Sequence, residues 1–250
     1  RLIHQDEINR FLAEYGHLRN LPFAREVLRH FGVSVAVKGL EHLPVQGPFV
    51  LVANHPLGGL DGLAIYDVIG KVRDRFASLS NDIIMQVQPL EGLFIPVNKH
   101  GRQSKENLAI LQDKIASGYG IIIFPSGLVS RRHDGAIGDL AWKKTAITIA
   151  RKNQIPLVPL FIEGRLSERF YKTYTWRKRL GIKANIEMIL LPDEMYRLRG
   201  TRVTLHLGPP LQPESLSNGE GDAAWTKRVR SLVYSLDPAK PATNPHADAH

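Results

Sequence analysis

The sequence lacks several features that mark large enzyme classes. Its 250 residues include no cysteine, which excludes disulfides and thiolate nucleophiles. No run reaches about 18 consecutive apolar residues, the length that predicts a membrane-spanning helix. The sequence also has no internal repeat, no glycine-rich dinucleotide fingerprint, no P-loop and no Gly-x-Ser-x-Gly nucleophile elbow. With 43% hydrophobic and 23% charged residues, the chain nevertheless has the composition of a globular protein.

Positive charge is concentrated in one segment. The chain has 33 basic and 24 acidic residues, and the segment 131–183 contains 13 of the basic and four of the acidic ones, so it holds the whole excess. A concentration of this kind favours binding to phosphates of a nucleic acid, a cofactor or a membrane. The alternative is a solvated face without a ligand.

Apolar periodicity predicts a single α/β domain with a mixed sheet covered by helices. Two amphipathic helices within 1–32 precede a domain over 33–236, and a polar tail over 237–250 is expected to be disordered. The stripes of the two helices suit either core packing or a membrane surface. We predict strands at 33–37, 49–53, 120–124, 155–162, 186–191 and 203–207, and helices at 59–73, 104–117, 139–152 and 223–235. An edge strand ended by Pro96 is one interpretation of residues 93–98.

A turn between the strand 49–53 and the next helix holds the most informative residues, His55 and Asp61. Ligands bind at the carboxyl ends of strands in open α/β sheets. A neutral histidine there can take a proton from a hydroxyl, while a carboxylate fixes its tautomer and stabilises the imidazolium. The alternative is a structural histidine with Asp61 capping the helix.

The stretch Asn54–Gly62, read as NHPLGGLDG, resembles the first motif of the glycerolipid acyltransferases, the family of 1-acylglycerol-3-phosphate acyltransferases. Five residues separate His55 from Asp61, where the common form has four. The longer form is similar to a hemolysin-like bacterial branch that includes makers of amino-acid lipids. The resemblance implies the fold of that family, with His55 as the catalytic base and Asp61 as its partner.

Three further stretches match the family's later motifs in order. Residues 93–98 correspond to the second motif, Phe124-Pro125-Ser126-Gly127 with Ser130-Arg131 to the third, and the strand 155–162 to the fourth. Ser126 replaces the usual Glu of the third motif. The resemblance implies an acceptor site formed by Asn54, Asn98, Phe124, Pro125, Ser126, Gly127, Ser130, Arg131 and Arg165.

The resemblance implies an O-acyltransferase of membrane lipid biosynthesis. The donor would be acyl-CoA or acyl-carrier protein, transfer would be direct, and no metal or cofactor is needed. The acceptor would be a lysolipid: 1-acylglycerol-3-phosphate is placed first, and a lyso amino-acid lipid such as ornithine or glycine lipid second. We expect a peripheral protein on the cytoplasmic face of an anionic membrane, without nucleic acid. Two alternatives stay open, a hydrolase using the same histidine and a non-catalytic basic module that binds membrane or nucleic acid.

Overall fold

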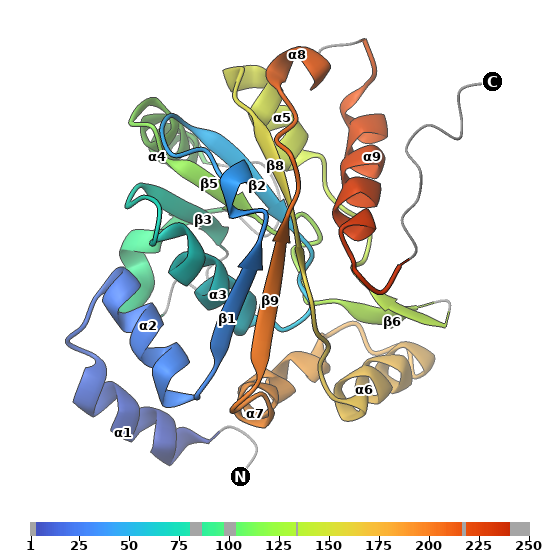
Figure 1. Cartoon of the computed structure of the whole chain (residues 1–250). Helices are drawn as coiled ribbons and strands as arrows, with labels where there is room; N and C mark the ends of the chain where they lie inside the picture. The colour runs from blue at the N-terminus through green and yellow to red at the C-terminus, as the bar shows by residue number, and fades with distance from the viewer. Residues whose placement is uncertain (1–3, 81–86, 98–103, 134, 217–218, 241–250) are drawn as a thin grey trace.

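The computed structural model describes residues 4–80, 87–97, 104–133, 135–216 and 219–240. Within these ranges a seven-stranded sheet has the order β1-β9-β8-β2-β5-β3-β4, and only the β8–β9 pair is antiparallel (Figure 1). The mixed α/β sheet predicted from the sequence is therefore confirmed. Its strands are β1 Ser34–Lys38, β2 Phe49–Ala53, β3 Phe76–Ser80, β4 Phe94–Pro96, β5 Gly120–Ile123, β8 Leu157–Ile162 and β9 Arg202–Leu207.

Both faces of the sheet are buried, as the continuous apolar strands require. In β2, Leu51 and Ala53 point into one hydrophobic cluster, while Val50 and Val52 point into the other. The first cluster includes residues of α2 Asn20–His30 and α3 Gly59–Ile69, and partly buried residues of α7 Leu191–Arg197 and α1 Gln5–Tyr15 pack against it. The second includes residues of α4 Lys105–Ala116, α5 Thr145–Asn153, α8 Pro213–Leu216 and α9 Asp222–Ser235. Within the described ranges, no helix has the length and apolar character to cross a bilayer.

The two N-terminal helices form, and the apolar stripe of the second belongs to the core. Phe23, Val27 and Leu28 of α2 are buried, and α2 packs against α3. Phe11 of α1 packs on the same cluster, whereas Leu12 is 39% exposed. Core packing thus accounts for the stripe of α2, and a membrane contact of α1 stays a prediction.

The structure corrects two expectations about elements and adds elements that were not expected. Residues 186–191 are not a strand, because Ile186–Leu190 forms a short 3₁₀ helix, η4, whose Glu187 is buried in an ion pair. The helix expected from residue 139 begins only at Thr145, since Asp139 is held by contacts described below. Strand β3 and the hairpin of β6 Arg131–His133 with β7 Ala136–Gly138 were not expected. The sequence has a further apolar run, Ile83-Ile84-Met85, which lies outside the described residues.

The parallel strands β8, β2 and β5 are neighbours, so their carboxyl ends meet at one edge of the sheet. The His55 turn follows β2 directly, and the third motif follows β5. Helix α6 Glu168–Arg179 follows β8 and packs against β6. Figure 1 shows α6, α7 and β6 below this edge, which makes it the end of the molecule to search for a site.

Candidate active site

His55 and Asp61 form a hydrogen-bonded pair at the end of β2. The distance from His55 Nδ1 to Asp61 Oδ2 is 2.8 Å, and the same oxygen accepts the backbone N–H of Leu57 at 2.9 Å. Asp61 is fully buried, whereas the His55 side chain is 13% exposed. Among the described residues, none bonds to His55 Nε2, the nitrogen that a substrate would contact. The five-residue spacing therefore brings Asp61 to His55, and the catalytic role of the pair stays a prediction.

The turn between the two residues explains how the longer spacing is accommodated. Gly58 has a φ of 70°, in the left-handed region that favours glycine, and it precedes the first residue of α3. Its carbonyl accepts the N–H of Asp61 at 3.1 Å, so the carboxylate stands in the first turn of the helix. Asp61 is thus fixed by both its backbone and its side chain.

The buried environment of Asp61 suits a carboxylate that stabilises the protonated form of His55. Burial raises the pKa of the Asp61 carboxyl, and the hydrogen bond from His55 opposes that shift. Asp61 Oδ1 is buried and has no hydrogen-bond partner among the described residues. A desolvated carboxylate gains most when its neighbour becomes a cation, because the attraction between charges is strong where water is excluded. The pair can therefore stabilise an imidazolium.

Phe124 and Ser130 hold His55 from the third motif. The rings of His55 and Phe124 stack with centroids 4.2 Å apart and an interplanar angle of 23°. The backbone N–H of Ser130 donates to the carbonyl of His55 at 2.7 Å. The third motif therefore packs directly on the histidine, and the predicted substrate contacts of these two residues stay predictions.

Asp139 is a further residue of the site that sequence reasoning missed. Its Oδ1 accepts the backbone N–H of His55 at 3.1 Å and the hydroxyl of Ser130 at 2.6 Å, and its Oδ2 accepts Trp142 Nε1 at 2.8 Å. The side chain is 1% exposed. Burial and the charge of Asp139 raise the pKa of nearby Tyr234 to about 12, so its hydroxyl stays neutral while accepting the Asp139 N–H. No local pattern links Asp139 to His55, since 84 residues separate them.

Several predicted acceptor residues are engaged within the protein. The Asn54 amide bonds both backbone groups of Ile162, at 3.0 Å from Nδ2 to the carbonyl and 2.7 Å from the N–H to Oδ1. The Ser126 hydroxyl donates to the carbonyl of Leu128 at 2.7 Å. These bonds hold the ends of β2 and β8 together and close the turn after β5. In this structure both side chains are engaged in hydrogen bonds within the protein, and their expected contacts with an acceptor stay predictions.

Arg131 is the predicted acceptor residue that is most deeply buried, and its contact with an acceptor stays a prediction. It is fully buried, with Nη2 3.0 Å from Glu187 Oε1, and its guanidinium lies over the ring of Phe170. A buried arginine saturated by a carboxylate cannot also take the phosphate of an acceptor without leaving that pair.

The remaining predicted residues are placed as follows. Pro125 is buried, and its carbonyl accepts the N–H of Lys143 at 3.0 Å. Gly127 is exposed with a φ of 66°, which keeps backbone accessible there. Arg165 is exposed in a shallow hollow that Arg197 also lines. Asn98 lies outside the described residues. In the part of the chain that the structure describes, no three His, Asp or Glu residues gather as metal ligands would.

The chain matches one family of proteins over most of its length. Residues 1–240 match the family model described as acyltransferase. Over 236 residues the chain is 39% identical to a lyso-glycine lipid O-acyltransferase from Phocaeicola vulgatus, which covers 94% of this chain and 85% of that protein. A protein of the same name from Bacteroides thetaiotaomicron is 38% identical over 237 residues, covering 94% and 87%.

More distant similarities involve a related activity. The 1-acyl-sn-glycerol-3-phosphate acyltransferase alpha of Homo sapiens is 26% identical over 156 residues, or 59% of this chain and 53% of that protein. The crystal structure of the 1-acyl-sn-glycerophosphate acyltransferase PlsC from Thermotoga maritima superposes with a TM-score of 0.54. Its sequence is 21% identical, covering 88% of this chain and 82% of that one, so this likeness concerns the fold.

Proposed function

Because this chain belongs to the acyltransferase family, we propose that it moves a fatty acyl group from an acyl thioester to the hydroxyl of a lysolipid. The observation that carries the proposal is the His55–Asp61 pair, with Nδ1 held at 2.8 Å and Nε2 without a partner among the described residues. A base in this tautomer can accept a hydroxyl proton only at Nε2.

The reaction follows from that geometry. His55 Nε2 takes the proton of the acceptor hydroxyl, and the oxygen attacks the carbonyl carbon of the thioester. Asp61 stabilises the imidazolium that results. The C–S bond then breaks as the new ester forms, and the imidazolium returns the proton to the departing thiolate. No acyl-enzyme is required. The donor is acyl-CoA or acyl-carrier protein, which places the reaction on the cytoplasmic face of the membrane.

We place a lyso amino-acid lipid first among the acceptors, reversing the order suggested by the sequence. The relatives that cover 94% of the chain are named for a lyso-glycine lipid, whereas the relatives named for a glycerophosphate cover 59%. In addition, Arg131, the expected phosphate contact, is buried against Glu187. Arg165 stays available, since it is exposed and a guanidinium can donate paired hydrogen bonds to either a carboxylate or a phosphate.

The test offers purified protein one acyl thioester with lyso-glycine lipid, lyso-ornithine lipid or lysophosphatidate. We expect turnover of at least one amino-acid lipid and its loss in His55→Ala, by roughly 100- to 10,000-fold for a positioned base. Turnover of lysophosphatidate alone would reverse the order of acceptors. Thioester cleavage that is independent of any acceptor would instead favour the hydrolase.

A further inference from the structure

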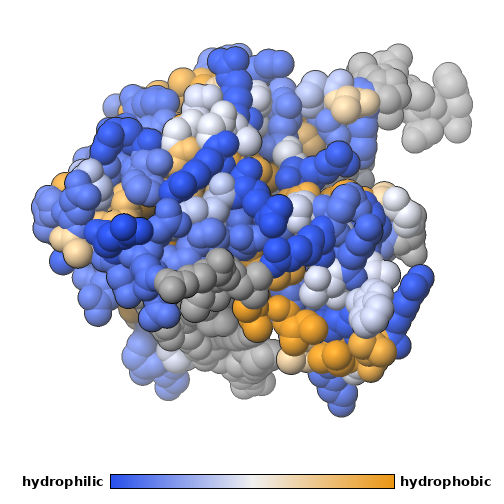
Figure 2. Space-filling model, turned by 90° about the horizontal axis from the view of Figure 1, so that it is seen from below, coloured by the Kyte–Doolittle hydropathy of each residue, from blue (hydrophilic) through white to orange (hydrophobic). Residues whose placement is uncertain are grey.

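Exposed apolar side chains gather on one segment that the proposed reaction does not use. Half of the large hydrophobic residues that are exposed in the described ranges fall between 176 and 189. Trp176 is 67% exposed, Leu180 63% and Ile189 56%. In the view from below, Figure 2 shows an orange patch at this end of the molecule, where Figure 1 places α6 and α7. We call it the α6–η4 surface, formed by Trp176, Leu180, Ile182, Ile186 and Ile189.

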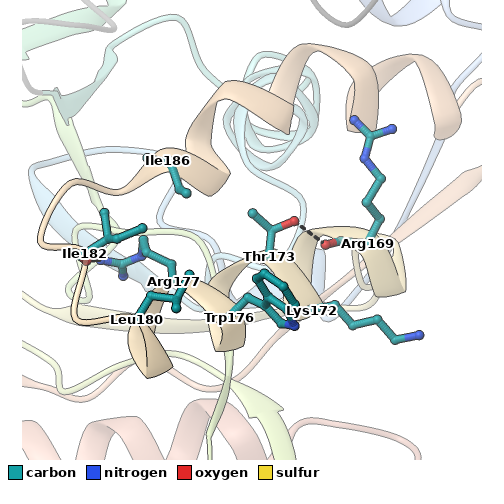
Figure 3. Close-up of a pocket in the computed structure, with 8 residues that line it drawn as sticks. All are labelled: Arg169, Lys172, Thr173, Trp176, Arg177, Leu180, Ile182 and Ile186. Atoms are coloured by element: carbon teal, nitrogen blue, oxygen red, sulfur yellow. Dashed lines mark hydrogen bonds between the residues drawn. The ribbon is translucent and has the colours of Figure 1, made fainter.

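The α6–η4 surface surrounds a groove whose base is held by buried polar contacts. A cavity of about 440 Å³ opens between α6 and η4, and Figure 3 shows Trp176, Leu180 and Ile186 around it. Arg177 turns inward beneath these side chains, with Nη1 donating to the carbonyl of Ile182 at 3.0 Å and Nε 2.8 Å from Glu187 Oε2. The groove is therefore shaped by buried polar contacts, and its apolar rim is left open.

The charge around the groove is positive. Lys178, Arg179 and Lys183 are exposed, and none of them forms an ion pair within the described residues. Two acidic residues near the groove are paired with other arginines. Glu187 pairs with Arg131 and Arg177, and Glu168 pairs with Arg132. Arg177, which the sequence groups with its two basic neighbours, therefore belongs to the base of the surface and not to its charge.

The α6–η4 surface is connected to the catalytic turn. Glu187 bonds Arg131, whose neighbour Ser130 donates to Asp139, and Asp139 receives the N–H of His55. Helix α6 also packs on β6, which begins at Arg131. A ligand on this surface would thus lie at the same end of the sheet as His55.

We infer that the α6–η4 surface docks on an anionic lipid bilayer, with Trp176, Leu180 and the isoleucines entering the headgroup boundary. Apolar and tryptophan side chains flanked by lysine and arginine are the composition of interfacial membrane helices. The three exposed cations supply the complement to anionic headgroups. The inference extends the proposed function, because a lysolipid acceptor and its product reside in such a bilayer. An acidic carrier protein or a second copy of this chain would be a different occupant.

Sedimentation with vesicles tests the inference without any acyl donor. We expect binding to vesicles rich in phosphatidylglycerol, with partitioning weakened at least about tenfold by Trp176→Ser with Leu180→Ser. Replacing Lys178, Arg179 and Lys183 by Gln should weaken it by roughly fivefold for each charge. The matched control is Leu108→Ser with Ile110→Ser, which alters exposed residues of α4 and should change nothing. Thermal melting of each variant confirms that it is folded.

Fluorescence gives a second measurement on the unaltered protein. Of the three tryptophans, Trp225 is 4% exposed and Trp142 is half-buried, so a blue shift on vesicle addition reports Trp176. The shift should vanish in Trp176→Phe. Vesicle binding that is unchanged in the folded α6–η4 variants would overturn the inference. Variants that keep vesicle binding but lose self-association, or lose binding to an acyl-carrier protein, would also overturn it, because the surface would then have a different occupant. Failure of acyl transfer by the parent protein would instead concern the proposed function alone.

Discussion

A substitution of Asp61 tests whether its pair with His55 contributes to catalysis or only stabilises the turn. Asp61→Asn keeps the size of the side chain and one acceptor oxygen but removes the charge that stabilises the imidazolium. We expect turnover to fall by roughly 100- to 10,000-fold in steady-state assays. The matched control is Asp67→Asn on the same helix, where the carboxylate pairs with Arg25 and Lys71 on the surface. A larger loss in that control would show that Asp61 is not the partner.

The same Asp61 variant has a predicted effect on stability. Burial raises the pKa of Asp61, so the folded protein holds a proton at pH values where the unfolded chain has released it. The free energy of unfolding therefore decreases as the pH rises above about 4. Asparagine cannot ionise, so the variant should gain stability relative to the parent between acidic and neutral pH. Urea unfolding at several pH values measures the difference in free energy of unfolding between the variant and the parent. A difference that becomes smaller as the pH approaches neutrality would contradict the raised pKa of Asp61.

Asp139 is expected to act as a positioning residue. Its carboxylate receives the N–H of His55 but lies on the backbone side of the histidine. Asp139→Ala should lower kcat by at least about tenfold while KM changes little, because misplacement of a base affects the chemical step. Asp139→Asn retains an acceptor oxygen and should recover most of that loss. Equal losses in both variants, or a loss confined to KM, would contradict a positioning role.

Among the elements, the sequence predicted those with strong and continuous apolar patterns. The strands β2, β5 and β8 were expected and form the centre of the sheet. Strand β3 was missed because it carries serines inside: Ser78 is 3% exposed and accepts the hydroxyl of Tyr66 at 2.9 Å. A buried serine needs a hydrogen-bond partner, and here the partner comes from α3, so the local sequence of β3 does not reveal it.

The segment 186–191 shows the opposite error. Its isoleucines and leucines have strand-like composition, but Glu187 in their midst is fully buried between two arginines from other elements. Pro192 stands in the first turn of the helix that follows. The ion pairs and this helix start fix a 3₁₀ turn where local propensity favoured a strand.

Removing the charge of Glu187 should release the α6–η4 segment. Glu187→Gln leaves Arg131 and Arg177 buried without a counter-charge, which costs about 3–5 kcal/mol when one partner of a buried pair is lost. Urea unfolding should show this loss. The control Glu168→Gln breaks the exposed pair with Arg132 and should change stability little. Similar results for the two variants would mean that the buried pairs do not hold the segment.

At the scale of the whole molecule, the order of motifs along the chain predicted the parts of the site, but not how they are joined. Parallel strands bring the first and third motifs together because β2 and β5 are neighbours. The sequence could not show that the side chains of Asn54 and Arg131 make contacts within the protein, since a polar residue near a motif has the same letter whatever it binds. Only the folded structure shows that Asn54 bonds to Ile162, which lies 108 positions further along the chain.

The charge excess of the molecule leads to a prediction about salt. The formal net charge is +9, and its local excess lies in the segment 131–183, which holds Trp176, Leu180 and Ile182 of the α6–η4 surface. At about 0.15 M salt the screening length is about 8 Å, so added salt shortens the reach of exposed cations toward headgroups. With acceptor in phosphatidylglycerol vesicles, we expect the apparent KM to rise with salt while kcat stays constant, because Asp61 is fully buried and only 13% of the His55 side chain is exposed to bulk ions. With the same acceptor in neutral detergent micelles, neither constant should change. Salt effects on kcat, or equal effects in micelles and vesicles, would show that the charge acts at the catalytic turn and not at a membrane surface.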